Sequence, residues 1–277
     1  MEGKAIYSIA KKEFLDNYRN KWIIALSIIF LILTLVISYF STRGGVGWKD
    51  LGNTIGGMMF FVQILIPIIA LMLSYATIVG EREKGSLSLL LSYPIKREEI
   101  IIGKFLGLSS VLAIAIFIGF GISGIIIGIN VKDVQWGDYL VFILSSILFG
   151  VVYIALAIFF SSVLKKRSTA IGAAIFIWFL FAMIWNIILF GILVSNYGFD
   201  KISQEDWMAP DWYYVSSIIN PITAFSMLVA LNVGPVQADI AGKLPTFYTT
   251  ETTLLILFLW VIIPLLVALY IFKKKDI

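Results

Sequence analysis

Residues 105–130 read FLGLSSVLAIAIFIGFGISGIIIGIN, an apolar run without a single Asp, Glu, Lys, Arg or His. A helix of about 20 apolar residues crosses the roughly 30 Å hydrocarbon core of a bilayer, so this run is long enough to span a membrane. Five further stretches have the same character, at about 22–40, 57–79, 139–164, 169–194 and 253–272. The sequence therefore predicts an all-α membrane protein with six transmembrane helices.

The composition excludes several kinds of chemistry. The chain has 277 residues, of which 60% are hydrophobic and 14% are charged, and it contains neither Cys nor His. Thiol chemistry, disulfides and the commonest metal ligand are therefore absent, and we predict no metal, no cofactor, no catalytic residue and no nucleic-acid partner. Ion-coupled transporters and proton pumps usually keep an ionisable residue inside the bilayer. These spans have none, so energy for any transport would enter from outside the membrane.

The distribution of basic residues predicts the orientation. Lys and Arg number five in the N-terminal lead, five in loop 80–104, three in loop 165–168 and three in the C-terminal tail, whereas the opposite loops together hold five. Cytoplasmic loops carry the excess of basic residues in membrane proteins. We therefore expect cytoplasmic N- and C-termini, in the plasma membrane of a prokaryote.

A further apolar stretch, Val215 to Val233, is broken by Asn220, Pro221 and Asn232. As a seventh span it would move the basic C-terminal tail outside, so we predict a helix that lies on or dips into the outer face. The surrounding segment 195–252 combines acidic residues with Trp and Tyr. Such a segment either caps the bundle at the aromatic belt or binds an extracytoplasmic partner.

Residues 1–21 form a separate element. Ile6, Ala10, Phe14 and Tyr18 recur every four positions, while basic residues take other faces. This pattern favours an N-terminal interfacial helix with its apolar side on the lipid bilayer. The alternative is a solvated cytoplasmic helix that leads into the first span.

The loop after the second span reads GEREKGSLSLLLSYPIKREE over residues 80–99. Ser86 can cap a short helix that runs to Tyr93, with Leu87, Leu90 and Leu91 forming an apolar ridge, and Pro94 ends that helix. Residues 96–104 then begin a helix that continues into the third span. We expect the ridge to project from the membrane and insert into a groove on another protein. The alternative, a segment lying on lipid, is disfavoured because anionic headgroups would repel its glutamates.

This loop and the Gly-Lys that follows at 103–104 resemble the signature of ABC-2 type transporter permeases. The pattern Ile219-Asn220-Pro221-Ile222-Thr223-Ala224-Phe225 is similar to a subgroup of that family, the permeases of nitrous-oxide-reductase maturation transporters. The resemblance covers the whole chain and implies a single permease domain, 1–277, without an ATP site of its own. It also implies two cytosolic ATP-binding cassette subunits, docked on helix 86–93, and a second permease that is either an identical copy or a sister chain.

The resemblance also indicates site residues. The ATPase-coupling loop would use Glu81, Arg82, Glu83, Gly85, Ser86, Leu87, Leu90, Leu91, Pro94 and Arg97. The second and fifth spans would line the path between protomers, which places Gln63, Ser74, Trp185 and Asn186 at or near it. The alternative for these polar residues is hydrogen bonding that holds helices together.

The function expected from these observations is that of a membrane subunit of an ATP-driven transporter, an exporter rather than an enzyme. Two other classes remain open. One is an ATP-independent channel or secondary transporter, whose transport would persist without an ATPase. The other is a membrane scaffold whose cytoplasmic loop recruits a partner without moving a substrate. Nothing in the sequence of the spans identifies the substrate.

Overall fold

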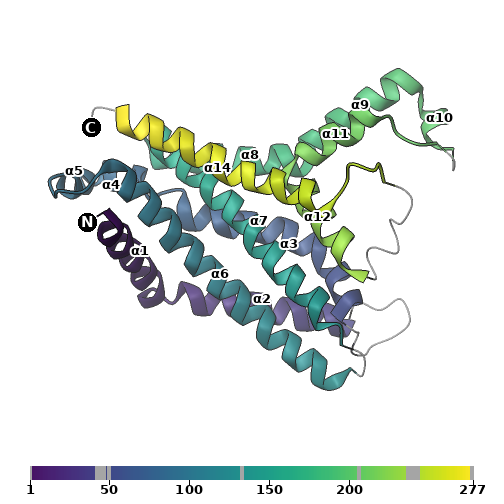
Figure 1. The fold of residues 1–277 in the computed structure, drawn as a ribbon, viewed down its shortest axis with the longest axis horizontal. Helices are drawn as coiled ribbons and strands as arrows, with labels where there is room; N and C mark the ends of the chain where they lie inside the picture. Colours follow the sequence, from purple (N-terminus) through teal and green to yellow (C-terminus); the bar gives the residue numbers. More distant parts are fainter. Residues whose placement is uncertain are drawn as a thin grey trace.

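The computed structural model describes residues 2–40, 48, 51–131, 134–204, 207–234 and 244–274, and these form helices and short connections without a β-strand. Within them, six helical segments are long and apolar enough to cross a membrane. They are α2 (Trp22–Phe40), α3 (Leu51–Ser74) continued by α4 (Val79–Glu83), α6 (Arg97–Asn130), α7 (Trp136–Val163), the run of α8 (Arg167–Phe179), η1 (Leu180–Ile184) and α9 (Trp185–Tyr197), and α14 (Thr250–Lys274). The predicted class and number of spans are confirmed (Figure 1).

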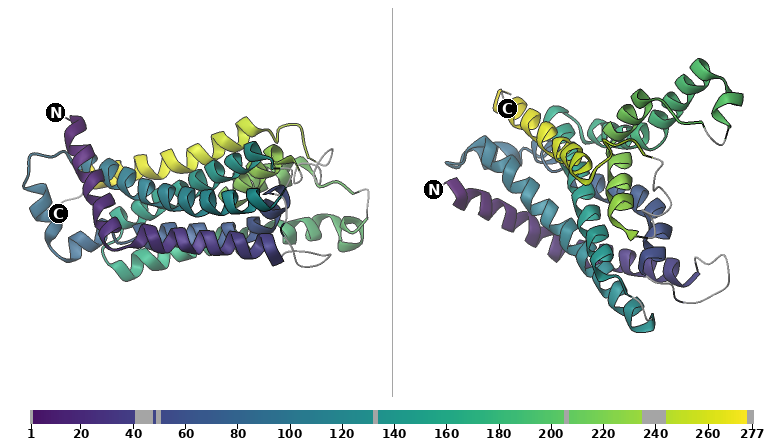
Figure 2. Two further views of the ribbon diagram at one scale, coloured as in Figure 1. Left: turned by 90° about the horizontal axis from the view of Figure 1, so that it is seen from below. Right: turned by 45° about the vertical axis from the view of Figure 1, so that its right-hand side comes forward.

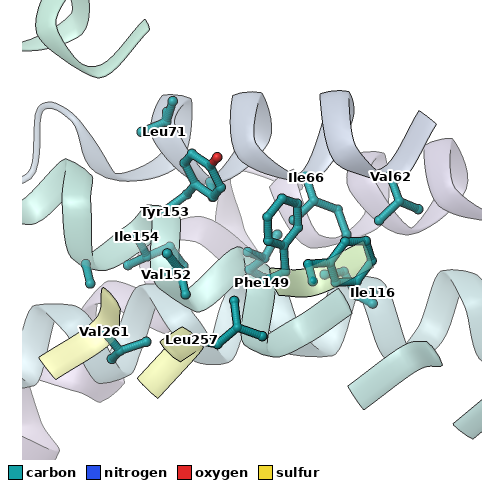
Figure 3. Packing of buried hydrophobic residues seen from close by; sticks show 14 of the residues in the cluster. Val62, Ile66, Leu71, Ile116, Phe149, Val152, Tyr153, Ile154, Leu257 and Val261 are labelled. Carbon is teal, nitrogen blue, oxygen red and sulfur yellow. The ribbon is translucent and has the colours of Figure 1, made fainter. Parts of the chain in front are cut away.

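The central helix of the bundle is α7. Phe149, Val152, Tyr153 and Ile154 on this helix are fully buried, and Figure 3 shows them among side chains of α3, α6 and α14. The Phe149 ring stacks on Phe225 with 4.5 Å between centroids. Helices associate in lipid through close packing, because the lipid tails are as apolar as the side chains. The packing around α7 therefore holds the spans together.

The N-terminal helix α1 (Glu2–Arg19) is separated from α2 by a turn at Lys21, whose φ is 58°. It packs along the first turns of α6, where glycines allow a close approach. A Cβ on Gly103 would lie 2.7 Å from Ile9 Cβ, and a Cβ on Gly107 would lie 2.7 Å from Ala10 O. The predicted helix is present. Its Ile9 is buried and the backbone of Ala10 lies against Gly107, so this part of α1 packs on α6.

The third span extends beyond the predicted apolar run. Helix α6 begins at Arg97, so the helix predicted from residue 96 is continuous with the span. The backbone N of Lys96 donates to Glu99 Oε2 at 2.9 Å, which satisfies a group at the helix start. Helix α1, helices α4 and α5 (Ser86–Leu91) and the end of α14 all lie at one end of the bundle (Figure 1). We refer to this as the loop end.

At the other end, which we call the arm end, α10 (Phe199–Ile202) follows α9 on an arm that leans away from the bundle (Figure 2). Helices α11 (Asp211–Ile219) and α12 (Pro221–Asn232) are bent by 103° at Asn220. The stretch predicted to dip into the outer face is therefore a broken helix pair rather than a straight seventh span.

Candidate functional site

Three consecutive charged residues of α4 at the loop end reach three different parts of the molecule. The first, Glu81, accepts a hydrogen bond from Lys104 Nζ of α6 at 2.7 Å. Lys104 also donates to Glu13 of α1 at 2.7 Å, and its side chain is only 2% exposed. These residues, Glu13, Glu81 and Lys104, form what we call the charge triad.

The charge triad is unusual because two carboxylates share one ammonium group inside the protein. Removing one partner of a buried ion pair leaves an uncompensated charge, which is why such groups fix neighbouring elements firmly. Within the described part of the chain, Glu81 Oε2 is buried and has no hydrogen-bond partner. The triad thus joins α1, α4 and α6 at one point.

The second charged residue, Arg82, binds the end of α7. Its guanidinium donates to Leu164 O at 2.9 Å and to Ser162 O at 3.3 Å. The last carbonyls of a helix lack partners within the helix and carry partial negative charge, so a cation there is favourable. Ser161, on the same turn of α7, accepts from the backbone N of Ile78 and of Val79 at 3.0 Å each. The start of α4 is therefore fixed to the end of α7.

The third charged residue, Glu83, binds the start of α8. It accepts from the backbone N of Arg167 at 2.8 Å, and its second oxygen lies 3.2 Å from Arg167 Nε. Arg167 also donates to Gly80 O at 2.8 Å, and a Cβ on Gly80 would lie 2.7 Å from that guanidinium. A glycine at position 80 therefore lets the arginine of α8 approach α4.

The leucines of α5 point in other directions than the sequence predicted. Gly85 has a φ of 73°, a left-handed conformation that suits glycine, and it reverses the chain between α4 and α5. Leu87 is 1% exposed and Leu90 packs on the core, whereas Leu89 is 65% exposed. The prediction that Leu87 projects outward is wrong, because this side of α5 faces inward and Leu87 belongs to the buried hydrophobic cluster. Only the backbone of Leu91 is described.

Helix α5 ends at Leu91, two residues before the predicted end, and Ser86 Oγ donates to Glu81 O at 3.3 Å. Tyr93 is 59% exposed, and the following Pro94 is exposed as well. Leu89 and Tyr93 therefore form the apolar part of the free side of this segment, which we call the α5 face. The opposite side of α5, which carries Leu87, is buried.

Beyond Pro94, the start of α6 is tied to the end of α14. Arg97 donates to Phe272 O at 3.1 Å, and Glu98 pairs with Lys273 at 3.1 Å. The carbonyls at the end of α14 gain a cationic donor in this way. Helices α4, α5 and the start of α6 are thus connected to α1, α7, α8 and α14.

The four residues predicted to line a path are not brought to one place. Gln63 Nε2 donates to Ser226 Oγ of α12 at 2.9 Å, and Trp185 Nε1 donates to Ser216 O of α11 at 3.1 Å. Ser74 is buried and donates to Ala70 O of its own helix. Asn186 is exposed on α9. The contacts of Gln63 and Trp185 match the alternative in which polar groups hold helices together.

The broken pair α11–α12 is held by buried hydrogen bonds around Asn220. Its side chain accepts from Ile222 N at 2.9 Å, which caps α12, and donates to Phe181 O at 2.7 Å. Phe181 belongs to η1, a π-helical turn in the fifth span, and π turns often occur at functional sites. Trp260 of α14 donates to Ile219 O at 2.8 Å. The fifth and sixth spans therefore both hold the bend.

Comparison with known proteins decides the family. The profile described as "ABC-2 family transporter protein" matches residues 7–277. The chain is 34% identical to the "Probable ABC transporter permease protein NosY" of Pseudomonas aeruginosa, covering 98% of this chain and 99% of that one. It is 31% identical to the protein of the same name from Stutzerimonas stutzeri, covering 98% of each chain. The chain belongs to the ABC-2 transporter family.

This ABC-2 permease is a multi-pass membrane protein and the membrane subunit of an ABC transporter, as the resemblance of loop 80–104 implied. Sequence reasoning missed Glu13, Lys104 and Asn220 as organising residues. A signal for Lys104 was present, because it is a lysine at the edge of an apolar run. Glu13 gave no signal, since an acidic residue on an amphipathic helix is ordinarily solvated.

Proposed function

We propose that this ABC-2 permease couples to two cytosolic ATP-binding cassette subunits through α5 and moves its substrate outward across the plasma membrane of a bacterium. The loop end would then face the cytoplasm, with both termini on that side. The observation that carries the proposal is the α5 face, an exposed Leu89 and Tyr93 on a segment tied to four other helices. A push received on this face would reach α1, α6, α7 and α8 together.

The mixed charges around the α5 face favour a protein partner over lipid. Glu83 and Lys84 are exposed beside it, and anionic headgroups would attract one and repel the other. A short helix with an apolar contact side is a common way to fill a groove on a partner protein. The relatives are named as probable ABC transporter permeases, and ABC transporters hydrolyse ATP on separate domains or subunits, so the partner we propose is the ATPase.

We also propose that the permease pairs with a second copy of itself or a sister chain along the fifth span. The exposed Asn186 lies on this span, which also exposes large apolar residues of α8, η1 and α9: Ile175, Phe176, Met183, Ile187 and Ile188. An exposed amide in hydrocarbon gains from a partner across a helix interface. Gln63, Ser74, Trp185 and Asn186 stay our proposal for residues near the path.

The test is co-purification of the ATPase from the native membrane in mild detergent. We expect Leu89→Asp and Tyr93→Asp each to weaken docking by about thirtyfold or more, since central apolar contacts of an interface contribute about 2 kcal/mol or more. Tyr7→Asp is the matched control, because Tyr7 is exposed on α1 at the same end of the molecule. Leu87 is unsuitable, since a buried Asp there would disturb folding.

Unchanged ATPase recovery with both variants would refute docking on the α5 face. A permease that purifies alone and transports without ATP would favour the channel or secondary-transporter alternative. A permease that retains the ATPase without any substrate stimulation of ATP hydrolysis would favour the scaffold.

A further inference from the structure

The charge triad connects the N-terminal helix to the segment that we propose docks the ATPase. Lys104 lies about two helical turns inside α6, Glu13 lies on α1 and Glu81 lies on α4. Both ion-pair distances are 2.7 Å and the ammonium group is almost completely buried. Removing one partner of a buried ion pair leaves an uncompensated charge, which is strongly unfavourable. The three side chains therefore resist separation.

Close backbone packing supports the same connection. Glu13 lies directly over Gly107, where an added Cβ would be 2.7 Å from Glu13 Cβ and from Ala10 O. Gly103, one turn earlier, is in equally close contact with Ile9. Lys104 lies between these two glycines in the sequence, so the ion pair and the helix contact reinforce each other. Helix α1 can hardly move relative to the start of α6 while both are intact.

The other charges of α4 do not reach α1. Arg82 binds the end of α7 and Glu83 binds the start of α8. Of these three charged residues of α4, Glu81 is linked to α1 among the described residues. The link passes through Lys104, which pairs with both Glu81 and Glu13. Loss of Lys104 would also leave two carboxylates facing each other without a cation, which drives them apart.

We propose that Lys104 is a positioning residue that makes α1, α4 and the start of α6 one moving unit. A displacement of α5 and α4 by the ATPase then carries α1 with it along the membrane surface. This rests on the proposed docking at the α5 face and adds a role for α1, a helix that sequence reasoning leaves as a membrane-surface element. Lys104 touches neither the ATPase nor a substrate and acts through Glu81 and Glu13.

The test measures the distance between α1 and α5 by pulsed electron paramagnetic resonance, with one nitroxide label on each helix segment. The chain contains no cysteine, so Tyr7→Cys and Ser92→Cys, both at exposed positions, give one defined label pair that leaves Leu89 and Tyr93 of the α5 face intact. The complex is purified with its ATPase, placed in lipid nanodiscs and measured without nucleotide and with ATP plus vanadate. If the complex holds two permeases, the labelled chain is assembled with an unlabelled one.

With Lys104 in place, we expect a narrow distance distribution that nucleotide leaves unchanged, because α1 and α5 move together. Lys104→Met should broaden this distribution and make its mean shift with nucleotide, and Lys104→Arg should restore the narrow, unshifted distribution. Lys84→Met is the matched control, since it removes an exposed lysine from the same loop without touching the triad. A merely structural lysine would not produce a nucleotide-dependent shift.

The proposal is overturned if Lys104→Met gives the same distribution as the parent in both states, or if the parent itself shifts with nucleotide. If Lys104→Met does not accumulate, the variant Glu13→Gln/Glu81→Gln/Lys104→Met removes all three charges, leaves none unpaired and is judged by the same two outcomes. The nucleotide-free measurement needs no ATPase. If the ATPase does not bind but Lys104→Met still broadens the nucleotide-free distance distribution, only the docking proposal is refuted.

Discussion

The contact between α1 and α6 can be tested by adding a single methyl group. Replacing Gly107 by Ala puts a Cβ 2.7 Å from Ala10 O and Glu13 Cβ and 3.1 Å from Ala10 Cα. Two of these atoms belong to the backbone of α1, which cannot rotate away as a side chain would. Overpacking of this kind costs about 1–3 kcal/mol. Helix α1 must therefore shift outward or detach more often.

A cost of about 1–3 kcal/mol raises the fraction of molecules with α1 detached by about 5- to 150-fold. Lys11, Lys12 and Arg19 on α1 are exposed and are trypsin sites, so limited proteolysis in detergent reports this fraction when cleavage is slow relative to reclosing. Gly121→Ala is the control on the same helix, because no described residue lies within 4 Å of its new Cβ. Both changes raise the helix propensity of α6 equally. Equal cleavage rates in the two variants would refute close packing of α1 on α6.

Two further predictions concern the stability of the bend at Asn220 and of the core. Asn220→Ala removes both the cap on Ile222 N and the donor to Phe181 O, and it should destabilise the protein by about 1–3 kcal/mol. Thermal unfolding in detergent measures this loss, and an Asn220→Ala variant as stable as the parent would contradict the role of the amide. Phe149→Ala should cost about 3 kcal/mol, the lower part of the usual range, because the unfolded side chain remains in lipid or detergent. Phe258→Ala, on the exposed side of α14, should change the unfolding temperature little, and a loss as large as that of Phe149→Ala would count against the buried stack.

The loop end shows where the local pattern of the sequence stops being informative. Pro94 limits α5 on its C-terminal side, although the helix ends at Leu91, two residues before the predicted end, and Gly85 in its left-handed conformation lies directly before the helix. The direction of its leucines is a different matter. Leu87 and Leu89 lie on a helix of six residues, too short for its periodicity to identify the buried side. That side depends on where the ends of α7 and α8 lie.

The alternating charges of residues 81–83 could be recognised as unusual but not paired from the sequence. Each has its partner on another helix, at separations in sequence of 23 residues for Lys104, 82 for Leu164 and 84 for Arg167. Such contacts are decided by how the spans cross, and the crossing depends on glycine positions such as 103 and 107. The sequence places basic residues near the membrane surface without saying which carboxylate each one meets.

By itself, the sequence determined which loop carries the charged motif and, within the described residues, the six apolar helices that are long enough to cross a membrane. The physical reason is that hydrocarbon tolerates only long apolar helices with all backbone groups paired, so the spans are visible in composition alone. Only the tertiary structure decided that Lys104 joins α1 to α4, that Leu87 faces inward and that Asn220 holds the bend beside a π-helical turn. These features depend on distances between helices, which close packing sets residue by residue and which no single helix encodes.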